Sequence, residues 1–118
     1  MDAVNLEAKL NLIREYWKPK IVAEVNDSYV KLVKFKGEFV WHHHDREDEL
    51  FHVLKGHLRI DLPDGALHLR EGELAVIPRG IDHRPVADEE VQVLLLEPTT
   101  TINTGETRGD RTVEAEWI

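Results

Sequence analysis

The sequence predicts a single all-β domain, a small barrel or sandwich with one short α-helix in front of it. The chain has 118 residues, the size of one domain with its own hydrophobic core. From residue 21 onward, short apolar and β-branched runs follow one another closely, and turn residues separate them. This spacing favours a sandwich or barrel over alternating strands and helices. We therefore expect residues 1–118 to form one domain, with the barrel in residues 21–97.

The N-terminal helix is predicted for residues 5–17. Asn5 has a side chain that suits an N-cap, and Pro19 ends the pattern. The apolar residues between them recur at helical spacing: Leu6, Leu10, Ile13 and Trp17. This stripe predicts a helix that packs on the barrel or on a second subunit.

Eight strands are predicted from alternating or continuous apolar runs, in residues 21–25, 29–36, 49–55, 58–62, 66–70, 74–77, 83–86 and 91–96. The alternation slips at Leu32 and Val33, which predicts a bulge, and residues 87–90 are predicted to form a turn. The side chains predicted to fill the barrel are Phe51, Val53, Leu58, Ile60, Val76 and Val93. In the polar segment 98–118, the terminal Trp117 and Ile118 predict a return onto the body or onto a neighbouring subunit.

Composition excludes several classes of function. There are 23 acidic and 15 basic residues, and the net charge of −8 disfavours binding to nucleic acid or to an anionic membrane. The absence of cysteine excludes disulfides and thiolate metal sites. No apolar run approaches the roughly 18 residues of a membrane span, and no signal peptide is visible at the start of the sequence. We expect a cytoplasmic protein.

Three consecutive histidines carry the strongest chemical signal. On a strand, residues two apart point to the same face, so His42 and His44 share one face and His43 the other. Glu49 is the natural inward carboxylate of the next strand, because it shares a face with Phe51, a residue suited to a core. These three side chains predict part of a metal coordination sphere.

A fourth ligand is predicted far along the chain. His83 follows Pro78-x-Gly80, a turn in which proline presets φ and glycine permits an unusual backbone path. Three imidazoles and a carboxylate suit one divalent transition metal, which can be Fe, Mn, Ni, Zn or Cu. An octahedral ion in this site keeps open positions for a substrate or for oxygen.

These residues resemble the two motifs of the cupins, specifically of the small single-domain type. The first motif is matched by Gly37, His42, His44, Glu49 and Gly56, and the second by Gly72, Pro78, Gly80 and His83. The resemblance implies a double-stranded β-helix, or jelly-roll barrel, that holds a metal through His42, His44, Glu49 and His83. It does not imply one reaction, because cupins include enzymes of several classes as well as binding and storage proteins.

The chain departs from the cupin pattern at two points. The spacer between Gly37 and His42 is one residue shorter than usual, and starting the motif at His43 would make Asp45 the second ligand. We favour His42 and His44, because two imidazoles fit the ligand set of the family better. The second departure is Ala87, which stands where the second motif ends in asparagine.

The resemblance and the residues together predict a metal-dependent enzyme that acts on a small polar organic molecule. The reaction is expected to resemble that of a dioxygenase or of a sugar or keto-acid isomerase, with Glu49 also available as a general base. The alternative is a non-catalytic module that binds or senses a sugar or another small molecule. A homodimer is expected, because the N-terminal helix, Trp41, Trp117 and Ile118 supply apolar surface beyond the barrel.

Overall fold

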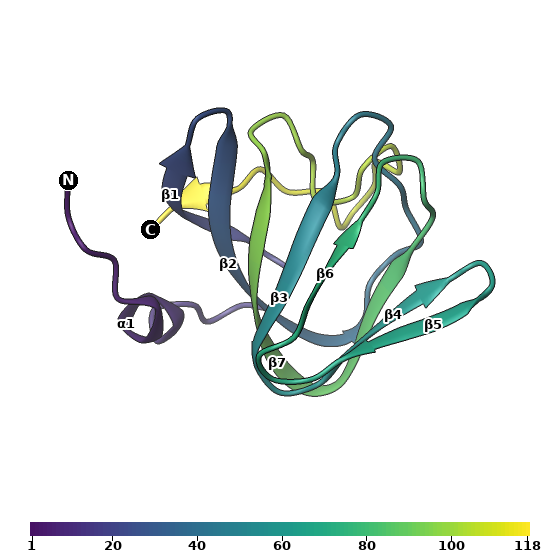
Figure 1. The fold of residues 1–118 in the computed structure, drawn as a ribbon, viewed down its shortest axis with the longest axis horizontal. Coiled ribbons are helices and arrows are strands. Elements are labelled where there is room, and N and C mark those ends of the chain that lie inside the picture. Colours follow the sequence, from purple (N-terminus) through teal and green to yellow (C-terminus); the bar gives the residue numbers. More distant parts are fainter.

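The computed structural model describes all 118 residues, and its regular structure is almost entirely strand (Figure 1). The elements are α1 (Leu6–Leu10), β1 (Lys20–Val25), β2 (Ser28–Glu38), β3 (Glu49–Lys55), β4 (Leu58–Leu62), β5 (Gly65–Leu69), β6 (Leu74–Ile77), β7 (Arg84–Pro98) and β8 (Glu116–Trp117). The predicted all-β fold with a short N-terminal helix is confirmed. No helix has the length and apolar character that crossing a bilayer requires.

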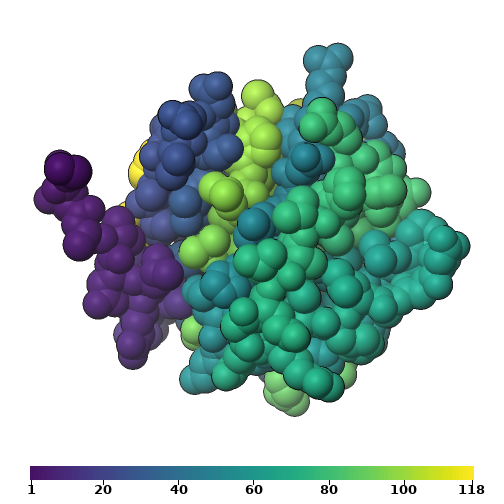
Figure 2. Space-filling model, in the orientation of Figure 1, coloured from purple at the N-terminus to yellow at the C-terminus, as the bar shows by residue number.

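The helix is shorter than the predicted range 5–17. Asn5 caps its first turn, and α1 ends at Leu10. Trp17 has a φ of 65°, and its ring stacks on Phe35 of β2 with the ring centroids 4.3 Å apart. The helical spacing of apolar residues in the sequence therefore extends past the end of the helix. Trp17 fits this spacing, but it packs on the sheet from a different backbone conformation. In Figure 2 the purple N-terminal residues project from the rounded body.

The eight strands form one sheet that curls without closing. Its order is β5-β4-β7-β2-β1-β8, and β3 joins β7 to β6. Every pair is antiparallel except β1 with β8. The long strand β7 organises this sheet, because β2 lies along one side of it while β4 and β3 share the other side.

The predicted turn in residues 87–90 is wrong. β7 runs through this acidic stretch, and its pairing with β2 resumes on both sides: Gly37 pairs with Ala87 and Phe35 with Val91. The extra residues of β7 are accommodated by an irregularity in the ladder between Phe35 and Gly37. Consecutive acidic residues look like a turn in the sequence, but pairing with β2 on either side of them keeps them within the strand.

The bulge predicted at Leu32 and Val33 lies on the neighbouring strand instead. The pairing of β2 with β7 is regular at these residues, whereas β1 shifts register between Ile21 and Ala23. Leu32 and Val33 are both fully buried because β2 is covered on both faces. Val33 packs inside the sheet, while Leu32 packs in a second cluster with Leu10 of α1.

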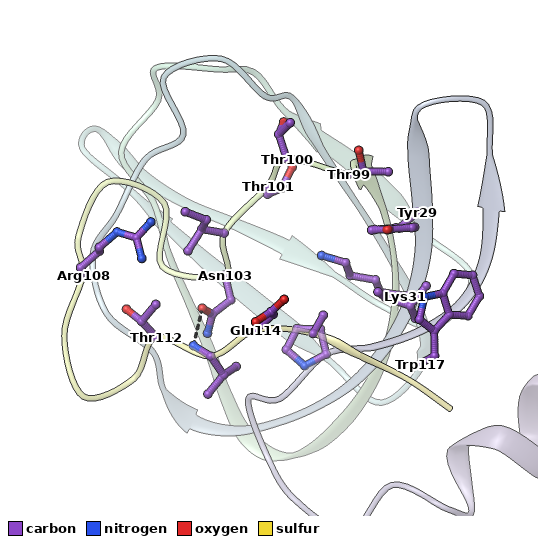
Figure 3. Close-up of a pocket in the computed structure, with 15 residues that line it drawn as sticks. Tyr29, Lys31, Thr99, Thr100, Thr101, Asn103, Arg108, Thr112, Glu114 and Trp117 are labelled. Carbon is purple, nitrogen blue, oxygen red and sulfur yellow. Dashed lines mark hydrogen bonds between the residues drawn. The ribbon is translucent and has the colours of Figure 1, made fainter.

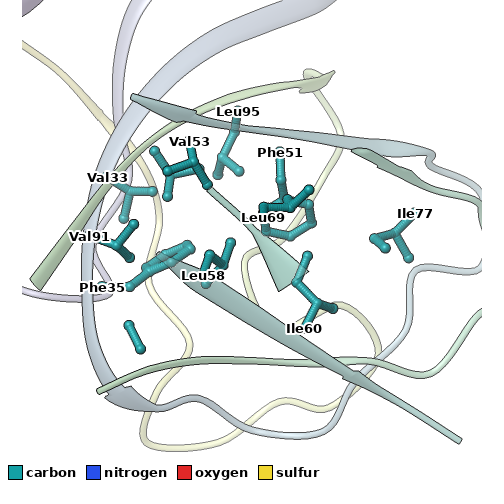
Figure 4. Packing of buried hydrophobic residues seen from close by; sticks show 12 residues of the cluster. Val33, Phe35, Phe51, Val53, Leu58, Ile60, Leu69, Ile77, Val91 and Leu95 are labelled. Carbon is teal, nitrogen blue, oxygen red and sulfur yellow. The ribbon is translucent and has the colours of Figure 1, made fainter. Parts of the chain in front are cut away.

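The main core is a cluster of 12 buried residues inside the curled sheet (Figure 4). Of the side chains predicted to fill the barrel, the cluster contains Phe51, Val53, Leu58, Ile60 and Val93. The prediction for Val76 is wrong, because its side chain is 49% exposed and its neighbour Ile77 is buried. The continuous apolar run of β6 has no polar alternation, so the sequence does not reveal which of its side chains face inward.

The C-terminal segment returns to the body of the molecule. β8 pairs with β1, and the Ile118 N–H donates a hydrogen bond to the Ile21 carbonyl at 3.1 Å. Thr101 and Thr104 on the way there are buried. The segment therefore covers one end of the sheet.

Candidate metal centre

The two sequence motifs meet through a backbone bridge. His42 lies between β2 and β3, and His83 lies immediately before β7. Each donates its N–H to the carbonyl oxygen of the other, at 3.0 Å from His42 and 2.9 Å from His83. This bridge holds the two imidazoles with their ring centroids 4.3 Å apart, although 41 positions separate the residues in the sequence.

His44 and Glu49 complete a compact group with these two histidines. One donor atom from each of His42, His44, Glu49 and His83 lies within 4.8 Å of the others, and all four residues are buried. Glu49 Oε1 lies 3.4 Å from His44 Nε2 and 3.5 Å from His83 Nε2. The structure thus brings together the four residues that the sequence singled out, from three separate places in the chain.

Backbone carbonyl groups orient two of the imidazoles. His42 Nδ1 lies 2.9 Å from the carbonyl oxygen of Val40, and His83 Nδ1 lies 2.8 Å from that of Ile81. A neutral imidazole that donates from Nδ1 keeps a lone pair on Nε2. This arrangement is the usual outer support of a metal-binding histidine, and it directs both Nε2 atoms into the group.

The donor set fits a cation because several of its atoms have no partner in the chain. His44 Nδ1 and Nε2, Glu49 Oε1 and His83 Nε2 are buried and form no hydrogen bond. Burying polar atoms without partners costs free energy, and native proteins rarely retain such atoms without a reason. A cation among the inward atoms would satisfy both Nε2 atoms and the carboxylate oxygen at once.

Burial and neighbouring charges shift the pKa values of three members of this group. Burial, assisted by the charge of His83, lowers the pKa of His42 to about 4, so this imidazole is neutral at pH 7. Burial raises the pKa of Glu49, but the neighbouring Glu97, His44 and His83 side chains outweigh it and hold that pKa well below its ordinary value. Burial likewise lowers the pKa of His44, and the Glu49 carboxylate reverses this effect, so the net pKa is raised.

Glu97 is a residue of the site that sequence reasoning missed. It lies near the end of β7, is buried, and accepts a hydrogen bond from Lys31 Nζ at 2.8 Å. Burial and the neighbouring charge of Glu49 raise its pKa well above the ordinary value, against the effect of Lys31. The pKa values of the two neighbouring carboxyl groups are thus shifted in opposite directions. Nothing in the sequence distinguishes Lys31 and Glu97 from the other charged strand residues.

The residues of the alternative register lie outside the group. The side chain of His43 is 36% exposed, and its ring contacts two carboxylates: Nε2 lies 2.9 Å from Asp45 and Nδ1 lies 3.0 Å from Asp82. Asp45 is exposed. These side chains satisfy one another at the surface, and none of them points at Glu49.

A small chamber lies beside the group, with a volume of about 20 Å³. Aromatic and aliphatic side chains form much of its wall: Trp17, Phe35, Phe39, Phe51 and Leu95. His42, Glu49 and Glu97 also line it. This volume accommodates about one water molecule, so the chamber leaves little room for solvent beside His42 and Glu49.

Comparison with known proteins identifies relatives of the chain. The model of the cupin domain family matches residues 29–97. The chain is 43% identical over 81 residues to an uncharacterized protein, YdbB, of Bacillus subtilis (strain 168). The match covers 68% of this chain and 72% of that protein.

Two solved structures are also similar. A cupin-2 domain protein from Shewanella frigidimarina NCIMB 400 is 44% identical with a TM-score of 0.79, covering 80% of this chain and 93% of that one. Protein NMB1881 from Neisseria meningitidis is 34% identical with a TM-score of 0.76, covering 82% of this chain and 99% of that one. Because the family model matches more than half of the chain and the bridge between His42 and His83 unites both motifs, this protein belongs to the cupin family.

Proposed function

We propose that this cupin is a metal-dependent enzyme that acts on a small polar organic molecule. His42, His44, Glu49 and His83 would hold one divalent transition metal: Fe, Mn, Ni, Zn or Cu. The observation that carries the proposal is the set of buried, unpartnered donor atoms converging within this group. Three nitrogens and one oxygen suit any of these metals, and availability decides which one is loaded.

Bound in this site, the ion would supply Lewis-acid polarisation of a carbonyl group or activation of oxygen. The chain itself contributes orientation, exclusion of water and control of a proton. Val40 and Ile81 orient two of the ligands, and the aromatic wall keeps bulk water out. The raised pKa of Glu97, next to Glu49 with its lowered pKa, suits this pair of carboxyl groups to exchange a proton with a substrate atom.

The organic substrate would approach from a larger cavity next to the chamber (Figure 3). This outer cavity has a volume of about 530 Å³, within the range of small-molecule sites. Pro19 and Asn103 line both the outer cavity and the inner chamber, so these residues form the wall between them. Tyr29, Lys31 and Arg108 offer hydrogen-bond donors to a polar ligand.

Metal analysis followed by turnover assays tests this function. Purified protein is analysed for bound metal and then assayed for oxygen uptake and carbonyl isomerisation on a panel of hydroxylated and keto acids and sugars. One metal per chain with metal-dependent turnover supports the enzyme and distinguishes the two reaction classes. Stoichiometric metal and ligand binding without turnover on any substrate would instead establish a binding module.

We also propose that the chain forms a homodimer through the outer face of β3, β6 and β7. Register places apolar residues in rows across this face: Val76, Leu50 and Leu96 in one, Leu74 and Leu94 on either side of His52 in the other. Leu50 and Leu94 are half-buried, and the other three are exposed. Leu74 is 55% exposed and Val76 49%. A contiguous apolar face of this kind is typical of a protein interface.

Light scattering at several concentrations tests the dimer. Val76→Glu should give a monomer, because a charge in the centre of a dimer interface is left unpaired. Val25→Glu is the matched control, since Val25 is equally exposed, at 56%, but lies on β1 away from this face. A wild-type monomer at all concentrations would contradict the proposal.

A further inference from the structure

After β7 the chain folds back over the metal centre. Residues 101–106, called the C-terminal clamp below, begin at the buried Thr101 and include the buried Thr104. The Glu106 N–H donates a hydrogen bond to the carbonyl oxygen of His43 at 3.0 Å. The clamp is thus bonded to the main chain between His42 and His44.

Gly105 forms the close contact between the clamp and the histidine run. Its φ is +55°, and a Cβ atom at this position would overlap the carbonyl oxygen of His43 and lie 2.8 Å from the carbonyl carbon. The same Cβ would lie 3.3 Å from His44 Nδ1. Only glycine permits this approach, on both steric and conformational grounds. The contact requires glycine because the clamp lies directly against the backbone and ring of the histidine run.

His44 is the imidazole that this contact would affect. The Nδ1 atoms of His42 and His83 face backbone carbonyl groups, whereas Nδ1 of His44 has no hydrogen-bond partner. On the other side of His44, the Gly80 N–H donates to its carbonyl oxygen at 2.8 Å. The backbone of His44 is therefore held from two sides, and packing against the clamp takes the place of a hydrogen bond to its ring.

We propose that the C-terminal clamp sets the orientation of His44 in the metal centre and that Gly105 is its positioning residue. This inference rests on the proposed metal site. It adds to that site a segment outside residues 29–97, the part of the chain that the cupin family model matches. The effect of the clamp is on metal affinity and on the rate of metal release, because a misplaced imidazole weakens coordination.

The clamp has its own internal supports. The Asn103 side chain donates to the Arg111 carbonyl at 2.9 Å and accepts from the Val113 N–H at 3.0 Å. The hydroxyl groups of Thr104 and Thr112 lie 2.6 Å apart. Removing the Asn103 side chain should loosen the clamp without touching any ligand.

The test compares Gly105→Ala with Gly109→Ala. A Cβ on Gly109 meets nothing within 4 Å and its φ is not in the left-handed region, so this variant is the matched control. Binding of Co²⁺ is followed by visible absorption, and release is timed after adding a chelator. We expect Gly105→Ala to bind Co²⁺ about tenfold to 100-fold more weakly, as for loss of an outer support, and Asn103→Ala about threefold. Gly109→Ala should match the wild type.

A double-mutant cycle separates positioning of His44 from support of the fold. In the His44→Ala background, Gly105→Ala should change Co²⁺ affinity by less than about twofold, because the ring it positions is gone. Persistence of the full loss in that background would overturn the inference, and so would wild-type affinity in both Gly105→Ala and Asn103→Ala. If the wild type itself binds no Co²⁺, the proposed metal site fails and the inference with it. If Gly105→Ala does not fold, the same cycle is run with Asn103→Ala.

Discussion

Two groups of imidazoles and carboxylates lie within a few residues of each other, and they differ in what satisfies them. The outer group consists of His43, Asp45 and Asp82, which contact one another at 2.9 and 3.0 Å at the surface. The inner group of His42, His44, Glu49 and His83 is buried and leaves four side-chain atoms without partners. Similar residue types therefore form an ordinary surface cluster in one place and a candidate ligand set in the other.

The difference teaches that burial without partners, rather than proximity, distinguishes the candidate metal site from the surface cluster. Exposed charged groups are solvated and gain little from pairing. Buried ones need a partner of opposite charge or a proton to share. Members of the two groups alternate along a single run of histidines, His42 and His44 being buried and His43 partly exposed.

The largest effect is expected from removing an inner ligand. Loss of one imidazole or of the carboxylate takes away a direct bond, so His83→Ala and Glu49→Ala should each weaken metal binding well beyond about 100-fold. Elemental analysis after dialysis measures the loss, and thermal unfolding of the metal-free proteins controls for folding. Full metal content in either variant would remove the distinction between the two groups.

The pH dependence of the metal-free protein gives the next largest effect. The pKa of His42 is lowered from 6.5 to about 4, so its contribution to the free energy of unfolding is complete above pH 6.5 and is lost as the pH falls towards 4. The shift corresponds to about 3 kcal/mol. Urea denaturation at pH 7 and pH 4 measures it, and His42→Gln should lose less stability over this range than the wild type. An equal loss of unfolding free energy between pH 7 and pH 4 in the two proteins would contradict the lowered pKa of His42.

A smaller effect is expected in the outer group. His43→Ala removes contacts that are exposed to water, so the free energy of unfolding should fall by less than about 1 kcal/mol. Its metal content should equal that of the wild type, whereas His42→Ala should lose metal. The reverse result would mean that His43 and Asp45 supply the ligands, as in the alternative register of the motif.

The smallest effect is expected at a second surface pair. His57 and His68 stack with ring centroids 5.0 Å apart, and His57 Nε2 lies 3.0 Å from His68 Nδ1. Both residues are exposed, so His57→Ala should change the free energy of unfolding by no more than about 0.5 kcal/mol and leave metal content unchanged. Denaturation and elemental analysis check both values. A loss of metal here would show that proximity of imidazoles suffices.

Local patterns predicted most of the strands, and failed where a distant contact decides the outcome. Helical spacing extends to Trp17, but stacking on Phe35 places that residue outside α1. The acidic residues after Ala87 look like a turn, but the pairing of Ala87 and Val91 with β2 holds them in β7. Val76 looks like core and is exposed, because an unbroken apolar run does not say which face is inward.

The site was predictable to the extent that it follows the cupin motifs. Motif spacing and strand alternation together selected His42, His44, Glu49 and His83. They could not reveal Glu97, whose role depends on Lys31 and Glu49 across the sheet. They could not reveal Gly105 either, since nothing local distinguishes a glycine that must touch another segment.

The sequence by itself determined which side chains share a face and which elements form, because alternation and turn chemistry act over a few residues. Only the tertiary structure decided that His42 and His83 are bridged, that the clamp lies against His44, and that the pKa of Glu97 is raised beside Glu49. The physical reason is that coordination, close packing and pKa values depend on distances between segments. The folding of the whole chain sets those distances.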